Sequence, residues 1–245
     1  MRSAVCISGL PRSGIPSRDL RINYNNLKQN FPNSDFYLST WVGQEDVMKK
    51  HFNDFNVWYQ PEPKIDYHPF ADMEMTFHTA KLEKTIKQSK DNKIFRETSS
   101  HQTKQIIGHA RLLSKITEKY DVIIRTRFDT FTSPKANFNI FIEDSFKNKR
   151  AIGFACLKED WPNFHSLREM DPKTEYVKHF LFDQLIIHHI DNINVANIFE
   201  LSENKKLFAA EFGWWQVLSQ NSGSNHRCFS GWANPDKSVL PHFLT

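Results

Sequence analysis

The chain has 245 residues, a formal net charge of +4, 39% apolar residues and 24% charged residues. These values are ordinary for a globular protein. The mild positive charge, without a long run of Lys and Arg, argues against a nucleic-acid-binding arm and favours small anionic ligands. The length is enough for one large α/β domain, and we predict a single domain over residues 1–245.

The cysteines Cys6, Cys156 and Cys228 have neither the even number of a complete disulfide framework nor the spacing of a zinc site. This favours a reducing compartment. The N-terminal apolar stretch is too short for a signal peptide, and no window approaches the length of a membrane span. The sequence therefore predicts a cytoplasmic protein without a transmembrane segment.

Strands and helices alternate at the start of the chain. The predicted elements are, in order, a buried strand over 4–7, a helix over 20–31, a strand over 35–41, a helix over 45–52 and a strand over 56–59. This alternation is typical of a parallel sheet with crossover helices.

Residues 60–100 are rich in Lys, Asp and His, and their pattern does not assign them to regular elements. We predict a long excursion from the sheet here, with one helix at about 77–88. Later elements follow as a helix over 102–120, a strand that begins at 122, strands at 151–155 and 185–187, and a helix over 211–218. The predicted fold class is α/β, with a central, mostly parallel sheet flanked by helices.

The segment YDVIIRTRFDT, residues 120–130, is a β-branched run that ends abruptly in charge. Because side chains alternate along a strand, Arg125, Arg127 and Asp129 are predicted to share one face. Charges at the end of a buried strand favour a ligand site. The alternative is an internal Arg–Asp salt bridge with a purely structural role.

A second polar segment, SGLPRSG, follows the first predicted strand. Ser8, Gly9, Arg12 and Ser13 are predicted phosphate contacts, since glycines let the backbone approach a ligand and an arginine forks onto phosphate oxygens. The alternative is a plain strand-to-helix turn. Because both segments leave carboxyl ends of parallel strands, together they predict a phosphate-binding cleft.

The strings AVCISGLPRS, DFYLSTW, YDVIIRTRFDT, FDQLIIHHIDNINVANIFE and AEFGWWQVL resemble a family of glycosyltransferases from bacterial surface-polysaccharide clusters, large DNA viruses and phages. The resemblance covers most of the chain outside residues 60–100. It implies a GT-A-like, Rossmann-type fold. It also implies transfer of a sugar from a nucleotide-diphosphate sugar to a hydroxyl of a glycan or related acceptor.

Enzymes of this kind usually hold a divalent cation with an Asp-x-Asp motif, where this chain has Arg127-Phe128-Asp129. The resemblance implies Mn²⁺ or Mg²⁺ at Asp129. Near the C-terminus, His226 is a candidate late metal ligand and Lys237 a candidate phosphate contact, and the alternative is that each is incidental. With one carboxylate in the motif, metal dependence is open. Arg125 and Arg127 are the alternative means of neutralising the diphosphate.

Sugar transfer needs a carboxylate that removes the acceptor proton. Asp183, in the family-like segment FLFDQL, is the first candidate, and Glu211 in AEFGWW is the second. Trp214 and Trp215 beside Glu211 are of the kind that stack on sugars. The alternatives are a capping role for Asp183 and a core position for the tryptophans.

Two rival functions remain open. The loop from Gly9 to Gly14, with Arg125 and Ser133, resembles the phosphosulfate site of sulfotransferases, but Ile15-Pro16 stands where that family has threonines. The other rival is a non-catalytic nucleotide-binding or interaction domain that keeps the fold without the carboxylate chemistry.

Overall fold

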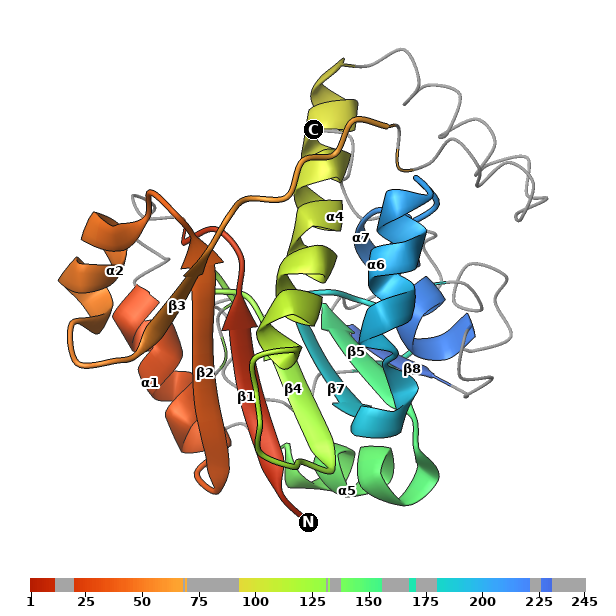
Figure 1. Ribbon diagram of the computed structural model, residues 1–245. Coiled ribbons are helices and arrows are strands. Elements are labelled where there is room, and N and C mark those ends of the chain that lie inside the picture. Colours follow the sequence, from red (N-terminus) through yellow and green to blue (C-terminus); the bar gives the residue numbers. More distant parts are fainter. Residues whose placement is uncertain are drawn as a thin grey trace.

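A computed structural model describes residues 1–11, 20–67, 69, 93–130, 132, 138–155, 168–170, 180–220 and 226–230. In this part of the chain, eight strands form one sheet in the order β3-β2-β1-β4-β7-β5-β8-β6 (Figure 1). The strands are β1 Ser3–Ser8, β2 Ser34–Trp41, β3 Val57–Gln60, β4 Val122–Thr126, β5 Ala151–Ala155, β6 Arg168–Glu169, β7 Leu185–His189 and β8 Arg227–Ser230.

The sheet is mostly parallel. Strand β1 pairs in parallel with β2 and β4, β2 with β3, and β5 with β8. Strand β7 lies antiparallel between β4 and β5, and β6 is antiparallel to β8 at the edge. Because only β6 and β7 oppose the common direction, the predicted fold class is confirmed.

Helices cover both faces of the sheet (Figure 1). They are α1 Leu20–Asn30, α2 Glu45–Phe52, α4 Lys93–Leu113, α5 Asn139–Asn148, α6 Val195–Glu203 and α7 Ala210–Trp215. One core cluster joins α1, α2 and α5 to the sheet, and another joins α4, α6 and α7 to the opposite face. Alternation along β1 supplies both cores, since Val5 and Ile7 face the first and Ala4 and Cys6 face α4.

Helix α4 differs from the sequence-based expectation at both ends. It begins at Lys93 instead of residue 102, and it ends at Leu113 instead of continuing to Tyr120. The tight backbone bond from Lys115 N–H to the Leu112 carbonyl and the Ser114 hydroxyl bond to the Ala110 carbonyl close its last turn. The helix predicted at 77–88 lies outside the described residues.

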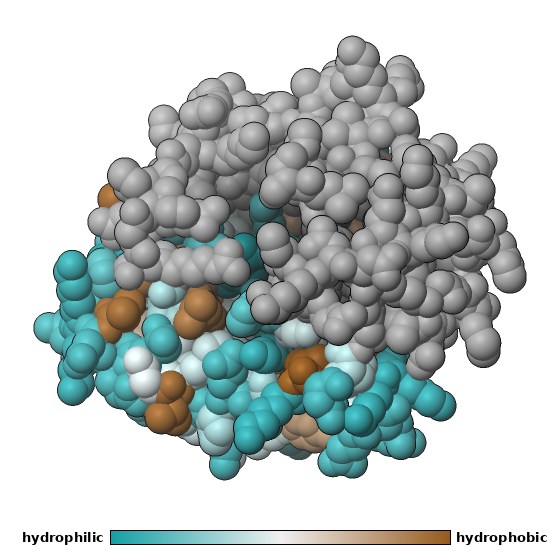
Figure 2. Space-filling model, turned by 90° about the horizontal axis from the view of Figure 1, so that it is seen from above, coloured by the Kyte–Doolittle hydropathy of each residue, from teal (hydrophilic) through white to brown (hydrophobic). Residues whose placement is uncertain are grey.

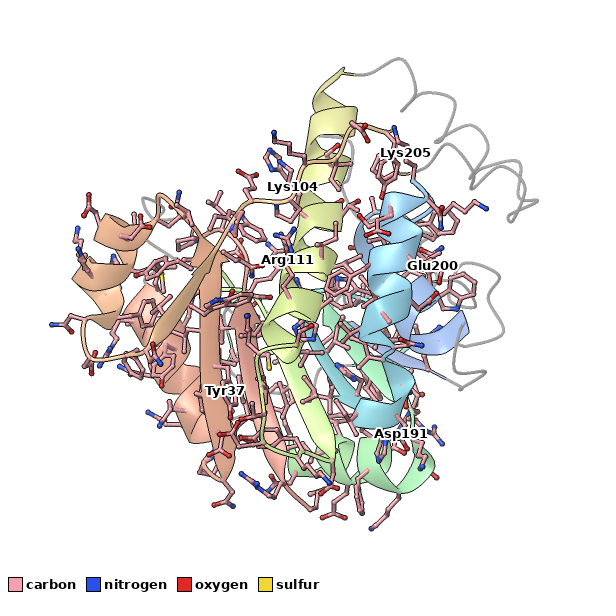
Figure 3. The ribbon with its side chains drawn as sticks, viewed as in Figure 1. Tyr37, Lys104, Arg111, Asp191, Glu200 and Lys205 are labelled. Atoms are coloured by element: carbon pink, nitrogen blue, oxygen red, sulfur yellow. The ribbon has the colours of Figure 1, made fainter. Side chains whose placement is uncertain are left out.

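The segment that leaves β3 runs across α4 and is tied to it, and Asp66 farther along accepts from Lys205, which follows α6, at 2.9 Å. Lys104 Nζ lies 2.7 Å from a Glu62 carboxylate oxygen, and Arg111 donates to the Pro61 carbonyl at 2.6 Å. The labelled side chains of α4 point toward this segment in Figure 3. These contacts place the start of the predicted excursion against the helix face that looks away from the sheet.

The described surface is mixed in polarity. On the face seen in Figure 2, the described apolar side chains lie singly among hydrophilic ones. None of the described helices combines the length and the apolar character needed to cross a membrane.

Candidate functional site

The candidate site lies where the chain order in the sheet reverses. From β1 the chain passes through α1 to β2 on one side, while β4 is the neighbour on the other side. The segments that follow β1 and β4 therefore diverge at the carboxyl edge of the sheet. Crevices at such positions bind ligands in open α/β sheets.

Ser8 and Gly9 begin the first of these segments. Gly9 has φ of +115°, which favours glycine, and its carbonyl accepts a 2.9 Å hydrogen bond from the Thr40 hydroxyl. A Cβ at Gly9 would lie 3.5 Å from Gln105 of α4. The fully buried Ser8 hydroxyl has no hydrogen-bond partner among the described residues. Arg12 and Ser13, the other predicted phosphate contacts, lie outside the described residues.

Arg125 is completely buried on the α4 side of the sheet, the side that Ile123 also faces. Its Nη1 donates to the main-chain carbonyl of Asp183, its Nη2 donates to Gln105 at 2.7 Å, and its guanidinium lies 4.5 Å from the Trp214 ring centre. Burial lowers the pKa of Arg125 to about 10. The sequence predicts that Arg125 contacts the diphosphate directly. Because Arg125 has no exposed surface, the structure does not place it for that contact. It braces the chain at Asp183 instead.

Arg127 and Asp129 form a two-pronged ion pair, with Nε 2.7 Å from Oδ1 and Nη2 2.7 Å from Oδ2. Strand β4 ends at Thr126, and Thr130 N–H donates to the Arg127 carbonyl at 3.3 Å, so a turn brings the pair together. Burial lowers the pKa of Arg127, but attraction to Asp183 and Asp129 outweighs it and leaves that pKa above its usual value. The internal Arg–Asp salt bridge, which the sequence analysis gives as the alternative to a ligand site, is therefore present.

Asp183 joins this pair from a distant part of the chain. Its Oδ2 lies 3.4 Å from Arg127 Nη1, and its side chain is 7% exposed while that of Arg127 is 22% exposed. Arg127 thus lies between two nearly buried carboxylates and keeps an open edge of its own. The charged side chains predicted at 127, 129 and 183 share one site.

The segment that carries Asp183 is held at successive residues. The Leu181 N–H donates to the Glu211 carbonyl at 3.1 Å, and a Cβ at Gly153 would lie 2.7 Å from the Phe182 carbonyl oxygen. The Gln184 carbonyl accepts from two threonine hydroxyls of the β4 segment. Such bracing fixes the position of the Asp183 carboxylate.

Glu211 lies in the first turn of α7 and is 7% exposed. Burial, followed by repulsion from Asp183, raises the pKa of Glu211 well above its usual value. Burial and the neighbouring charge of Asp183 therefore favour the protonated form of Glu211. A carboxyl group whose pKa is raised, close to a second carboxyl group and a guanidinium, is suited to proton transfer at an anionic ligand.

The tryptophans beside Glu211 are core residues. Trp214 is fully buried and Trp215 is 7% exposed. Their rings pack inside the cluster that joins α4, α6 and α7 to the sheet. The structure therefore places neither ring where it would stack on a sugar.

The described residues do not fit a divalent cation at Asp129. Both oxygens of its carboxylate accept hydrogen bonds from Arg127. No group of three or more His, Cys, Asp and Glu side chains in the described part of the chain is arranged to hold a metal. Lys237, the predicted phosphate contact, is outside the described part.

The structure does not bring His226 to Asp129. His226 precedes β8, where Arg227 is level with Ile152 of β5, which the register through β7 aligns with Ile124 of β4. His226 therefore lies toward the amino edge of the strands and three strands from β4, whereas Asp129 follows the carboxyl edge. The predicted two-residue ligand set is not assembled.

Sequence reasoning missed the residues that support this site. Gln105 binds Arg125 from α4, and asparagines of α1 donate to the turn after β4, Asn23 to the Phe128 carbonyl at 3.3 Å and Asn26 to the Thr132 carbonyl at 2.8 Å. The available signal was polar residues at helical spacing on faces that are otherwise apolar.

No family model matches the chain, and no curated protein matches it. Among solved structures, the 4-diphosphocytidyl-2C-methyl-D-erythritol synthase of Anaerococcus prevotii is 10% identical, with 98% of this chain and 91% of that chain covered and a TM-score of 0.48. A nucleoside-diphosphate-sugar pyrophosphorylase of Vibrio cholerae is 10% identical, with 93% and 91% covered and a TM-score of 0.44. The inositol-1-phosphate CTP transferase of T. maritima is 9% identical, with 94% and 86% covered and a TM-score of 0.40. These likenesses carry no argument about activity, which has to come from the site.

Proposed function

We propose that the chain is a glycosyltransferase that moves a sugar from a nucleotide-diphosphate sugar to a hydroxyl of a glycan or related acceptor. The observation that carries the proposal is the convergence of Asp183, Glu211 and Arg127 beside the carboxyl ends of β1 and β4. That position favours a nucleotide ligand, and those side chains match the two charges that sugar transfer has to manage.

Each group has a separate task in the proposed reaction. The bond between the anomeric carbon and the diphosphate breaks, its electron pair leaves on the diphosphate, and a new bond forms from the acceptor oxygen to that carbon. Asp183 takes the acceptor proton and later releases it to solvent. Arg127 compensates the charge that develops on the departing diphosphate. Glu211, whose neutral form is favoured by burial, donates a hydrogen bond within the site.

The segment after β1 is proposed to contact the nucleotide. Ser8 offers a buried hydroxyl without a partner among the described residues, and Gly9 has the backbone freedom that a close approach requires. Arg12 and Ser13 follow directly in the sequence and complete the proposed set of phosphate contacts.

Binding and turnover test this proposal together. The thermal unfolding midpoint is measured with a panel of nucleotide sugars, free nucleoside diphosphates and a phosphosulfate nucleotide, and release of nucleoside diphosphate is followed with the donors that stabilise the protein. We expect at least one nucleotide sugar to raise the midpoint and to be turned over. Stabilisation by the phosphosulfate nucleotide alone would establish the sulfotransferase alternative instead.

A further inference from the structure

Arg127 lies between two acidic side chains, Asp129 and Asp183. Its guanidinium contacts both oxygens of Asp129 at 2.7 Å and an oxygen of Asp183 at 3.4 Å. Both carboxylates are more than nine-tenths buried. Buried carboxylates need a compensating cation, and within the described chain this arginine supplies it to both.

The backbone holds Arg127 in this position from two sides. Its carbonyl accepts from Thr130 N–H, and the next residue, Phe128, has its carbonyl bound by Asn23 of α1. The Thr130 hydroxyl in turn binds the Gln184 carbonyl beside Asp183 at 2.8 Å. The ion pair is therefore part of a braced turn, unlike a mobile pair on the surface.

A divalent ion at Asp129 would have to displace the guanidinium or lie directly beside it. Displacement leaves a positive group near the ion in a poorly hydrated site, and like charges repel strongly there. Mg²⁺ and Mn²⁺ also require free oxygen ligands, and both Asp129 oxygens are already engaged.

Arg127 still has hydrogen-bonding capacity for an anion. A guanidinium carries five N–H groups, and the contacts with Asp129 and Asp183 use three of them. Its side chain is 22% exposed, so it is not sealed within the protein. Two remaining N–H groups would suit the paired oxygens of a phosphate that reached the guanidinium there.

We infer that Arg127 takes the place of the divalent cation: it holds Asp129 and Asp183 together and receives a donor phosphate on its open edge, so that transfer needs no metal ion. The identity of the phosphate ligand rests on the proposed function. The replacement of the metal by the guanidinium does not, because it concerns these three side chains alone.

Manganese binding to the full chain tests the inference without any substrate. The paramagnetic resonance signal of free Mn²⁺ is titrated with wild type, with Arg127→Ala and with Arg127→Gln. We expect no site in wild type below millimolar concentration. Removing the guanidinium frees two neighbouring carboxylates, so at least one of the two variants should bind Mn²⁺ at least about tenfold more tightly than wild type.

A surface pair provides the matched control. Arg21 forms a similar two-pronged pair with Asp54, at 2.9 and 3.1 Å, but outside the site. Arg21→Ala frees the single carboxylate of Asp54, whereas the Arg127 variants free two carboxylates. Mn²⁺ binding in Arg21→Ala should therefore stay as weak as in wild type.

Wild-type Mn²⁺ binding at micromolar concentration that Asp129→Asn abolishes would overturn the inference, and this readout needs no arginine variant to fold. Failure of both folded Arg127 variants to gain Mn²⁺ binding would also overturn it. If nucleotide-sugar turnover is found, it should persist in excess chelator, and its loss there would count against the inference. Absence of turnover with every donor would remove the proposed function but leave the Mn²⁺ result intact.

Discussion

The Thr130 hydroxyl donates a 2.8 Å hydrogen bond to the main-chain carbonyl of Gln184, a residue 54 positions later in the chain. The Thr126 hydroxyl binds the same carbonyl at 3.0 Å, and Arg125 binds the preceding carbonyl, that of Asp183. The end of β4 therefore holds the main chain at both residues of the Asp183–Gln184 step. Mutations that remove these hydrogen bonds should displace Asp183 more readily than they disrupt the fold.

Thr130→Val removes the hydroxyl and keeps the shape of the side chain. We expect turnover to fall roughly tenfold, because the Asp183 carboxylate loses a constraint, while donor affinity stays near that of wild type. Thr130→Ser keeps the hydroxyl and should retain most of the turnover. The measurements are kcat by nucleotide release and donor Kd by calorimetry. Equal turnover in the Val and Ser variants would show that the hydrogen bond does not position Asp183.

Asp183→Asn should lower turnover by roughly a hundredfold or more, since the amide cannot take the acceptor proton. Glu211→Gln should be milder, because burial raises the pKa of Glu211 and so favours its neutral form, and an amide keeps the size and the hydrogen-bond donor of that form. Single-turnover kinetics with matched donor-binding measurements separate the two effects. A larger loss in Glu211→Gln would exchange the two roles.

Asn26→Ala should destabilise the protein by about 1–2 kcal/mol, because it removes the buried donor to the Thr132 carbonyl. The neighbouring Asn25 is exposed on the same helix, and Asn25→Ala is the matched control. Alanine has the better helix propensity, so this control should be neutral or slightly stabilising. Urea unfolding of both variants gives the comparison. The bracing role of α1 would be refuted by equal free energies of unfolding.

His188 makes stability depend on pH. It is fully buried, and burial lowers its pKa from 6.5 to about 4. The neighbouring His109, 6.1 Å away between ring centres, also has a pKa lowered well below its usual value by burial and by the charges of His188 and Arg125. Both rings are therefore neutral in the folded protein at mildly acidic pH.

The unfolded chain takes up protons at these histidines as pH falls below about 6.5, whereas the folded chain does so only near pH 4 at His188. Stability should therefore be full above pH 6.5 and fall between 6.5 and 4, by about 3 kcal/mol for His188 alone. His188→Leu should flatten this part of the curve of unfolding free energy against pH. His101→Gln, at an exposed position, is the control and should keep the wild-type curve. If the unfolding free energy of His188→Leu fell with pH as steeply as that of wild type, protonation of His188 would be excluded as the cause.

Local pattern was enough to predict the elements whose side chains repeat regularly. The β-branched run at 122–124 was predicted, the strand predicted at 35–41 is observed at Ser34–Trp41, and helix α2 was predicted with its observed bounds. These signals survive because burial of one face imposes a period of 2 or 3.6 on the sequence. Strands β6 and β8 were missed, since they have only two and four residues, too few to display a period, and they form by pairing with distant segments of the chain.

Residue pattern was enough to predict that charge gathers where β4 ends, and it identified Arg127, Asp129, Asp183 and Glu211 as candidates. How these charges are used became visible in the folded chain. It buried Arg125 as a brace, paired Arg127 with two carboxylates and separated His226 from Asp129. The reason is physical. Which buried charges become neighbours depends on strand order and register, and contacts across more than fifty residues leave no local period in the sequence.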